Sequence, residues 1–216
     1  SSRMGGVDKL MEFLDNVPVL MRTLTALQQA DSIDEIVIAT RESALVDIST
    51  LCKTYGITKC SKVVRGGESR CHSVLLAALE ASPEAKLLAV QDGARPLVTP
   101  ELIDDVAEQA ARCGAAAPAG AVKDTIKVAQ AGVVQSTPDR GQLFAVQTPQ
   151  VFDRALLQEA LGQAAAEGLS LTDDCAAVER LGRPVYLTRG SEDNLKITTP
   201  RDLTWGQAIL AERMGR

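Results

Sequence analysis

Two short groups of residues in this sequence have the types and the placement needed to bind an anionic ligand. Residues 66–70, which read Gly-Gly-Glu-Ser-Arg, follow a β-like run and precede a helical pattern that begins near Ser73. Adjacent glycines let the backbone approach a ligand closely, and the start of a helix offers free N–H groups. Asp92 and Arg95 follow the apolar run 87–91. An acid and a base at the carboxyl end of a buried strand can hold a metal-bound phosphate and an anionic substrate group together.

Each of these groups also has a simpler interpretation. Residues 66–70 could form a plain turn, and Asp92 and Arg95 could form an internal salt bridge. We favour a functional role for Asp92 and Arg95 because open α/β sheets bind ligands at the carboxyl ends of their strands. Further polar groups, which could equally be solvated surface or helix caps, follow in order at 123–125, 139–140, 147–150, 172–174 and 193–200. Their joint order and spacing, more than any one of them, indicates a site.

The residue types that are scarce narrow the chemistry further. His72 is the only histidine, which excludes a multi-histidine metal site, and no G-x-S-x-G elbow accompanies it to suggest a hydrolase triad. The five cysteines are scattered without a C-x-x-C pair, which fits neither a disulfide framework nor a zinc site. The chemistry must therefore use carboxylates, lysines, arginines and the backbone.

Alternating β-rich and helical stretches must position these charged groups. Buried strands are predicted at 35–40, 62–65 and 87–91, and helices at about 43–56, 73–81, 99–114 and from 199 onward. Thr99-Pro100 and Thr199-Pro200 each pair an N-cap threonine with proline at the first helical position, and Gly114 suits a C-terminal cap. The alternation predicts an α/β fold with a doubly wound, mostly parallel sheet.

The segment 124–147 breaks this alternation. Two short β-like runs surround a glycine turn at Gly132, and a third run, LFAVQ, follows. The pattern predicts a β-hairpin arm that leaves the main sheet. Since the apolar face of such an arm needs cover, we expect a second copy of the chain to provide it, as a homodimer.

The composition is that of an ordinary globular enzyme. The chain has 216 residues, 45% of them hydrophobic, and a formal net charge of -5. We expect one domain, 1–216, with the arm as its appendage. No basic tract suggests nucleic acid as a partner, and no apolar run approaches the roughly 20 residues that span a bilayer. The polar opening 1–9 does not read as a signal peptide, so small molecules are the expected partners.

Seven ordered motifs cover essentially all of the chain. They read SSRM…DK, GGESRCHSV, DGARP, DTIK, DRGQLFAVQTPQVF, TDD and DNLKITTPRDL. By these motifs the chain resembles the 2-C-methyl-D-erythritol 4-phosphate cytidylyltransferases of the non-mevalonate isoprenoid pathway. The resemblance implies a Rossmann-like nucleotidyltransferase fold, Mg²⁺ as cofactor, and CMP transfer from CTP to the polyol phosphate, which releases pyrophosphate and forms 4-diphosphocytidyl-2-C-methyl-D-erythritol. It also implies a homodimer formed through the arm, in the bacterial cytoplasm or in a plastid.

The same resemblance implies roles for individual residues. The cations that grip the triphosphate and stabilise the reaction are expected to be Arg3, Lys9, Lys196 and Arg140. The residues that bind CTP are expected to be Gly67, Glu68, Arg70, Ser73, Asp92 and Gly93. The residues that bind the polyol phosphate are expected to be Asp92, Arg95, Thr125, Arg140, Thr148 and Thr172. Asp92 is also the candidate protein ligand for Mg²⁺, with most of the coordination supplied by the triphosphate.

The chain departs from the family pattern in two ways. The usual HDAARP reads QDGARP here, and the usual Pro-Lys of the opening loop reads Asp8-Lys9. Asp92, Arg95 and Lys9 are retained, so we expect modest consequences. The family also begins with an apolar strand and an alanine-glycine turn, and neither precedes the opening loop here. We therefore expect that a strand and a turn, roughly 10 to 20 residues, are missing from the middle of the sheet.

The expected reaction suits the available residues. In nucleotidyl transfer the attacking oxygen belongs to a phosphate that is already ionised, so no general base is needed. Fixed lysines, arginines and Mg²⁺ stabilise the charge that develops at the α-phosphate during in-line attack. Two alternatives remain open at this point: a ribitol 5-phosphate cytidylyltransferase, and a non-catalytic nucleotide-binding protein on the same fold. Retention of Arg3, Lys9, Arg140 and Lys196 disfavours the second.

Overall fold

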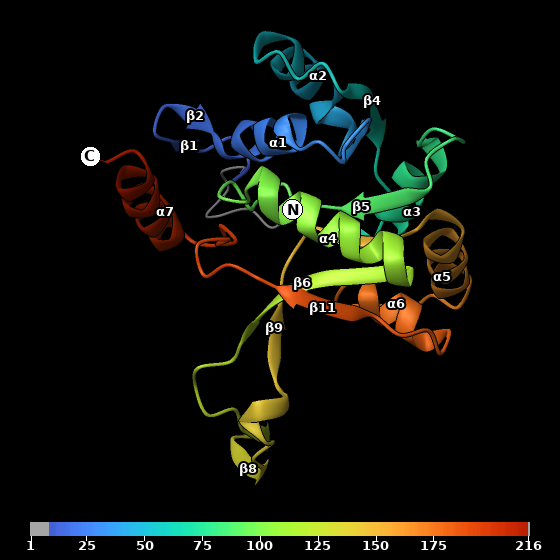
Figure 1. Cartoon of the computed structure of the whole chain (residues 1–216), viewed down its shortest axis with the longest axis vertical. Coiled ribbons are helices and arrows are strands. Elements are labelled where there is room, and N and C mark those ends of the chain that lie inside the picture. The colour runs from blue at the N-terminus through green and yellow to red at the C-terminus, as the bar shows by residue number, and fades with distance from the viewer. Residues whose placement is uncertain (1–8, 216) are drawn as a thin grey trace.

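The computed structural model describes residues 9–215 (Figure 1). The helices are α1 Val19–Gln29, α2 Leu45–Thr54, α3 Arg70–Glu80, α4 Pro100–Cys113, α5 Arg154–Ala166, α6 Cys175–Arg180 and α7 Pro200–Arg213, with short 3₁₀ turns η1 Glu42–Ala44 and η2 Arg140–Gln142. The strands are β1 Phe13–Leu14, β2 Val17–Pro18, β3 Ile36–Thr40, β4 Cys60–Arg65, β5 Leu87–Val90, β6 Ala115–Ala121, β7 Val128–Gln130, β8 Val133–Ser136, β9 Phe144–Val146, β10 Gln150–Asp153 and β11 Tyr186–Arg189.

The main sheet has the strand order β11–β6–β10–β5, and β9 pairs with the far end of β6. β11 is parallel to β6, whereas β10 runs antiparallel to both of its neighbours, so β5, β6 and β11 all point the same way. A separate parallel pair, β3–β4, follows the early helices. The predicted doubly wound α/β fold is confirmed, with β10 as an inserted antiparallel strand that the sequence did not suggest.

Helices cover both faces of the main sheet, because side chains along each strand alternate between faces. Ala116 and Val151 pack with α4 in one hydrophobic cluster. Their neighbours Ala115 and Phe152 pack with α5 and α6 in another. Figure 1 shows α4 in front of β5 and β6 and α6 close to β11. The carboxyl ends of β5 and its neighbours are left clear of helices and can carry a site.

The helix boundaries follow the local signals in the sequence. Thr99 Oγ1 accepts a hydrogen bond from the Leu102 N–H, and Gly114 ends α4 in the left-handed conformation with φ +85°. At α7, Thr199 and Asp202 form a reciprocal capping box. The helix predicted from about residue 43 begins instead as the η1 turn, and α2 itself starts at Leu45.

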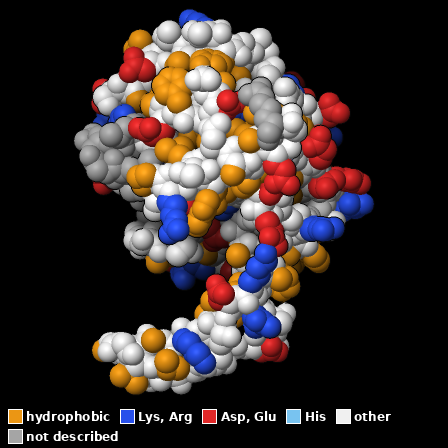
Figure 2. All heavy atoms as spheres, turned by 90° about the vertical axis from the view of Figure 1, so that its left-hand side faces the viewer, with side chains coloured by type: hydrophobic (Ala, Val, Ile, Leu, Met, Phe, Trp, Pro, Cys, Tyr) orange, Lys and Arg blue, Asp and Glu red, His pale blue; other side chains and the backbone are white. Residues whose placement is uncertain are grey.

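The predicted hairpin arm is confirmed. β7 and β8 pair antiparallel around Ala131 and Gly132, both with positive φ, and the arm projects from the body of the molecule (Figure 1). Its large apolar side chains are exposed to solvent: Ile126, Val128, Val133, Val134, Phe144 and Val146. Figure 2 shows hydrophobic side chains gathered at the tip of the arm. Exposed apolar surface of this kind is typical of an interaction site.

None of the helices in residues 9–215 is long and apolar enough to cross a membrane.

Candidate active site

Asp92 lies at the carboxyl end of β5 and forms the centre of the candidate site. β5 ends at Val90, and the Asp92 N–H donates a hydrogen bond to Thr148 Oγ1 over 3.1 Å. Thr148 is buried and lies just before β10, the strand paired with β5. The strand pairing, in which Gln150 lies opposite Val90, thus brings together two residues that are 56 positions apart in sequence.

Three cations surround the Asp92 carboxylate. Lys196 Nζ lies 2.6 Å from Asp92 Oδ2, and Arg95 Nε lies 3.9 Å from the same oxygen. Arg70 Nη2 lies 4.0 Å from Asp92 Oδ1. We refer to Asp92, Arg70, Arg95 and Lys196 as the Asp92 cluster. The cluster confirms that Asp92 and Arg95 lie together, and it joins both predicted motifs at one point.

The charge state of Asp92 follows from its surroundings. Burial alone would raise the pKa of Asp92, but the hydrogen bond from Lys196 and the charges of Lys196, Arg70 and Arg95 outweigh burial and lower that pKa. Asp92 is therefore ionised at neutral pH. An ionised carboxylate here holds the cations in place while no other anion is bound.

Arg70 is held by a second carboxylate, that of Asp174. The guanidinium donates two parallel hydrogen bonds, at 2.9 and 2.7 Å, to the two carboxylate oxygens of Asp174, which is only 1% exposed. Burial works to lower the pKa of Arg70, but the interaction with Asp174 outweighs it and raises that pKa. Asp174 is fixed in turn by Gln150, whose Oε1 accepts hydrogen bonds from the N–H groups of Asp174 and Cys175. The bidentate pair sets the direction in which Arg70 points.

Lys196 is placed by a buried loop ahead of α7. Asn194, 1% exposed, donates from Nδ2 to Thr148 O at 3.0 Å and to Gln147 Oε1 at 3.2 Å. Arg95 Nη1 donates to Asn194 O at 2.6 Å, so one cation of the cluster also anchors the loop that carries another. The segment that contains Thr148 therefore supports both Asp92 and Lys196.

The glycine-containing loop before α3 has an ordered geometry. Gly67 N–H donates to Ser73 Oγ at 3.1 Å, and Ser73 Oγ donates to Ser69 O at 2.8 Å. Ser69 caps α3 by accepting from the His72 N–H, which leaves Glu68 exposed at the loop surface. A side chain at Gly67 would collide with His72, so the loop needs glycine there. The loop ends at Arg70, which joins it to the Asp92 cluster.

Several predicted site residues lie outside the cluster. Thr125 and Arg140 are exposed on the arm, where Arg140 Nη1 donates to Lys123 O. Thr172 is exposed, two residues before Asp174. Arg3 lies outside the described residues. These positions remain predictions as ligand contacts.

Lys9 and Gly93 lie close to the cluster along the chain and in space. Lys9 is buried, at 6% exposed. The side chain of its neighbour Leu10 lies within van der Waals reach of a Cβ at Gly93, and Leu10 O accepts from the Leu20 N–H at 3.0 Å. The segment that begins the described chain therefore runs directly beside Asp92.

The structure also identifies site residues that the sequence analysis did not select. Asp174, Gln150 and Asn194 support Arg70 and Lys196, although none was predicted as a site residue. Gln150 carried a signal, because it is a polar residue at the start of an otherwise apolar strand. Asp174 carried none beyond a helix start, since its partner Arg70 is 104 positions away.

The donors available to a metal ion are few. Within residues 9–215 no group of three or more His, Cys, Asp or Glu side chains could hold a metal. Asp92 Oδ1 is the oxygen of the cluster that faces a cation only at 4.0 Å. This donor set fits a hard cation held mainly by a bound triphosphate with a single carboxylate contact from the protein.

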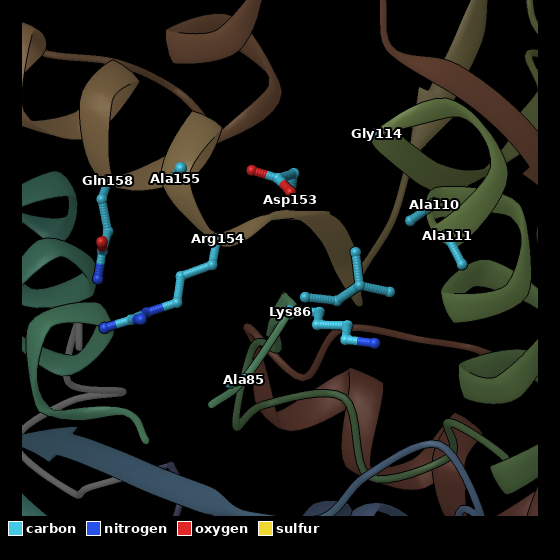
Figure 3. Close-up of a pocket in the computed structure, with 10 residues that line it drawn as sticks. Ala85, Lys86, Ala110, Ala111, Gly114, Asp153, Arg154, Ala155 and Gln158 are labelled. Carbon is cyan, nitrogen blue, oxygen red and sulfur yellow. The ribbon is translucent and has the colours of Figure 1, made fainter. Parts of the chain in front are cut away.

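A second hollow lies at the opposite, amino end of β5 (Figure 3). Lys86, Asp153 and Arg154 line it, and Arg154 donates to Pro83 O at 2.8 Å. It shares no residue with the Asp92 cluster. The cations that could bind a nucleotide gather at the carboxyl end of β5, as the strand-end rule for α/β sheets predicts.

Comparisons with known proteins agree on one family. The family model described as "2-C-methyl-D-erythritol 4-phosphate cytidylyltransferase" matches residues 1–212. A protein of that name from Halalkalibacterium halodurans is 41% identical over 211 residues, which cover 98% of this chain and 92% of the relative. Another, from Desulforamulus reducens, is 42% identical over 219 residues, with 98% and 92% covered.

Solved structures give the same result. The crystal structure of 2-C-methyl-D-erythritol 4-phosphate cytidylyltransferase from Thermus thermophilus superposes with a TM-score of 0.80 at 34% identity and covers 94% of this chain and 93% of that one. The 4-diphosphocytidyl-2C-methyl-D-erythritol synthase of Anaerococcus prevotii superposes with a TM-score of 0.85 at 28% identity, over 92% and 88% of the two chains.

Proposed function

The chain belongs to the 2-C-methyl-D-erythritol 4-phosphate cytidylyltransferase family, and from this premise we propose how its own residues serve the reaction. The enzyme transfers CMP from CTP to 2-C-methyl-D-erythritol 4-phosphate in isoprenoid biosynthesis. Ribitol 5-phosphate is disfavoured as the acceptor, because the family model and both relatives carry the methylerythritol name.

The observation that carries the mechanism is the Asp92 cluster at the carboxyl end of β5. Arg70, Arg95 and Lys196 converge on one carboxylate, so the site can neutralise the phosphates of two anionic reactants without a base. The acceptor phosphate is already ionised and attacks the α-phosphate of CTP, and pyrophosphate leaves. Positive charge that is fixed before the reaction stabilises the transition state without further rearrangement.

Lys196 is the cation best placed to change partners. Its side chain is 44% exposed although its Nζ lies 2.6 Å from Asp92. We infer that an incoming triphosphate competes with Asp92 for this ammonium group. Arg95 and Arg70 stay behind, since their side chains also bond to Asn194 and Asp174. Lys9 and Arg3 would add to the grip on the triphosphate, and the loop at Gly67, Glu68 and Ser73 would bind the cytosine.

Magnesium is proposed as the cofactor, with Asp92 as its one protein ligand. When bound, Mg²⁺ supplies charge neutralisation on the triphosphate. Asp92 would meanwhile keep Arg95 and Arg70 oriented toward the same phosphates. The scarcity of other oxygen donors near the cluster, within residues 9–215, supports a metal that arrives with the nucleotide.

A homodimer formed through the arm is proposed for this chain. The exposed apolar side chains on β7, β8 and β9 would be covered by a partner. Thr125 and Arg140 lie on the same arm, so dimerisation would carry them toward the polyol phosphate bound by the partner. We place the enzyme in the bacterial cytoplasm, as for the bacterial species from which the relatives come.

Pyrophosphate release with CTP, Mg²⁺ and methylerythritol 4-phosphate tests the proposal, with ribitol 5-phosphate offered in parallel. Lys196→Ala should lower turnover by about 10²–10³-fold, because it removes one stabilising group of the transition state. Lys53→Ala, an exposed lysine on α2, is the matched control and should leave turnover unchanged. Chelation by EDTA should abolish release, and Mg²⁺ should restore it. Unchanged turnover in Lys196→Ala would remove the central part of this mechanism.

A further inference from the structure

A large groove separates the two sheets of the molecule. It has a volume of about 980 Å³ and is lined by the whole of β3 and the whole of β5. We refer to this cavity, between Ile36–Thr40 and Leu87–Val90, as the strand groove. It lies inside the fold and not on its rim, since α1, α3 and α4 also contribute to its walls.

Two strand edges face the strand groove without a strand between them. β3 pairs only with β4, and β5 pairs only with β10, within residues 9–215. Each strand therefore presents the N–H and C=O groups of its other edge to the groove. Unpaired backbone groups in the interior are costly, and an open strand edge is a template for one more strand.

The two edges run in the same direction. At their amino ends, the Ser82 N–H ahead of β5 donates to Glu35 Oε2 ahead of β3 over 2.8 Å. At their carboxyl ends, the Gly66 N–H donates to Thr40 O, and the loop that follows carries Arg70 to Asp92, just after β5. One strand that is parallel to both could therefore pair with both edges at once.

The walls of the strand groove define the chemistry of its occupant. Leu20, Leu24 and Leu27 of α1 line one wall, and Val74 and Ala77 of α3 also face the groove. A strand that is covered on both faces is apolar throughout, in contrast to an alternating surface strand. Ala89, in the middle of β5, is exposed, as expected for a strand whose neighbour is lacking.

We propose that the strand groove binds one extended apolar segment of the same polypeptide, paired in parallel with β3 on one side and β5 on the other. About four to six residues would span it, since β3 has five and strands rise about 3.3 Å per residue. This proposal stands apart from the catalytic one, because it rests on the sheet edges alone.

The position of the described chain points to the side from which the occupant enters. Leu10 lines the strand groove and lies beside Gly93, at the carboxyl end of β5. A strand parallel to β5 ends at that same side, so a segment ahead of Lys9 can leave the groove there and continue without crossing the sheet. The occupied groove would also lock Leu10 and Lys9 beside Asp92.

The test attaches a six-residue strand of Val, Ile and Ala ahead of Ser1, with residues 1–8 as its connection to Lys9. The matched control carries Pro at the two central positions of that strand, because Pro cannot donate to a ladder. Amide hydrogen exchange is measured at Ile36–Thr40 and Leu87–Val90, together with Tm. Exchange should slow by on the order of 100-fold at both strands in the apolar version only, since several ladder hydrogen bonds form together.

A second variant keeps the test independent of how well each version folds. Ala77→Trp places a large side chain on the α3 wall, so it should prevent the protection of β3 and β5 in the chain with the attached apolar strand. Protection of both strands in that chain, lost with Ala77→Trp, supports the proposal. Equal exchange in the apolar and Pro versions, protection of only one strand, or protection that survives Ala77→Trp would overturn it.

Discussion

Replacing Asp174 by Asn isolates the ion pair that orients Arg70. Asp174 is 1% exposed and accepts both hydrogen bonds of the Arg70 guanidinium, at 2.9 and 2.7 Å. The amide keeps the volume of the carboxylate and its contact with Gln150, because Gln150 Oε1 accepts from the backbone N–H of residue 174. The substitution therefore removes one charge and one acceptor and leaves the packing intact.

The expected cost follows from the burial of the pair. Removing one partner of a fully buried ion pair costs about 3–5 kcal/mol. The side chain of Arg70 is 36% exposed, so water compensates part of this loss. We expect the free energy of unfolding to fall by about 1–3 kcal/mol, and Tm by roughly 3–10 °C for a chain of this length. Arg70 would also lose its fixed direction, which should raise KM for CTP by about tenfold, equivalent to one lost charge-assisted hydrogen bond.

Urea unfolding gives the stability change, and pyrophosphate release at varied CTP gives KM. Asp105→Asn, at an exposed position on α4, is the control for loss of one negative charge and should change neither quantity. A variant at Asp174 that unfolds within about 0.5 kcal/mol of the parent, a change typical of ordinary surface positions, would refute the assigned role of the pair. Normal stability with a raised KM would instead restrict that role to ligand binding.

Two further predictions concern Asp92 and the arm. The pKa of Asp92 is held below its usual 3.8, so its stabilising contribution is fully present above about pH 4 and is lost as pH falls through the lower, folded-state value; in urea unfolding between pH 5 and pH 2, Asp92→Asn should lose about 1–2 kcal/mol less than the parent. Val134→Asp on the arm should convert a dimer to a monomer in light scattering, whereas Val46→Asp, exposed on α2, should not. A parent chain that is already monomeric at working concentration would contradict the arm interface.

Local signals predicted the helices well where they were strong. The N-cap of α4 at Thr99, its Pro100 and its left-handed Gly114 all appear in the structure as expected. The position of Asp92 and Arg95 after a buried apolar run was also sufficient to select them. These features depend on residues within a turn or a strand of one another, which is why a sequence without a structure can reveal them.

The antiparallel strand β10 and the central strand β6 show where local reasoning fails. β6 reads AAAPAGA, a composition of low strand propensity, yet Ala115, Ala116 and Ala117 are completely buried between helices on both faces. Small side chains are accommodated there because α4 and α5 pack closely against the sheet. Propensity lost to tertiary packing at this point, and no local pattern could have shown it.

The Asp92 cluster explains why its supporting residues could not be found one motif at a time. Arg70 depends on Asp174, and Asp174 on Gln150, across three separate segments of the chain. Lys196 depends on Asn194, which bonds to the same segment, at Thr148, that positions Asp92. Each cation is therefore oriented by a residue whose chemistry is structural. A substitution at Gln150 or Asn194, neither of which joins the ion pairs around Asp92, should consequently alter nucleotide binding through the cations that they position.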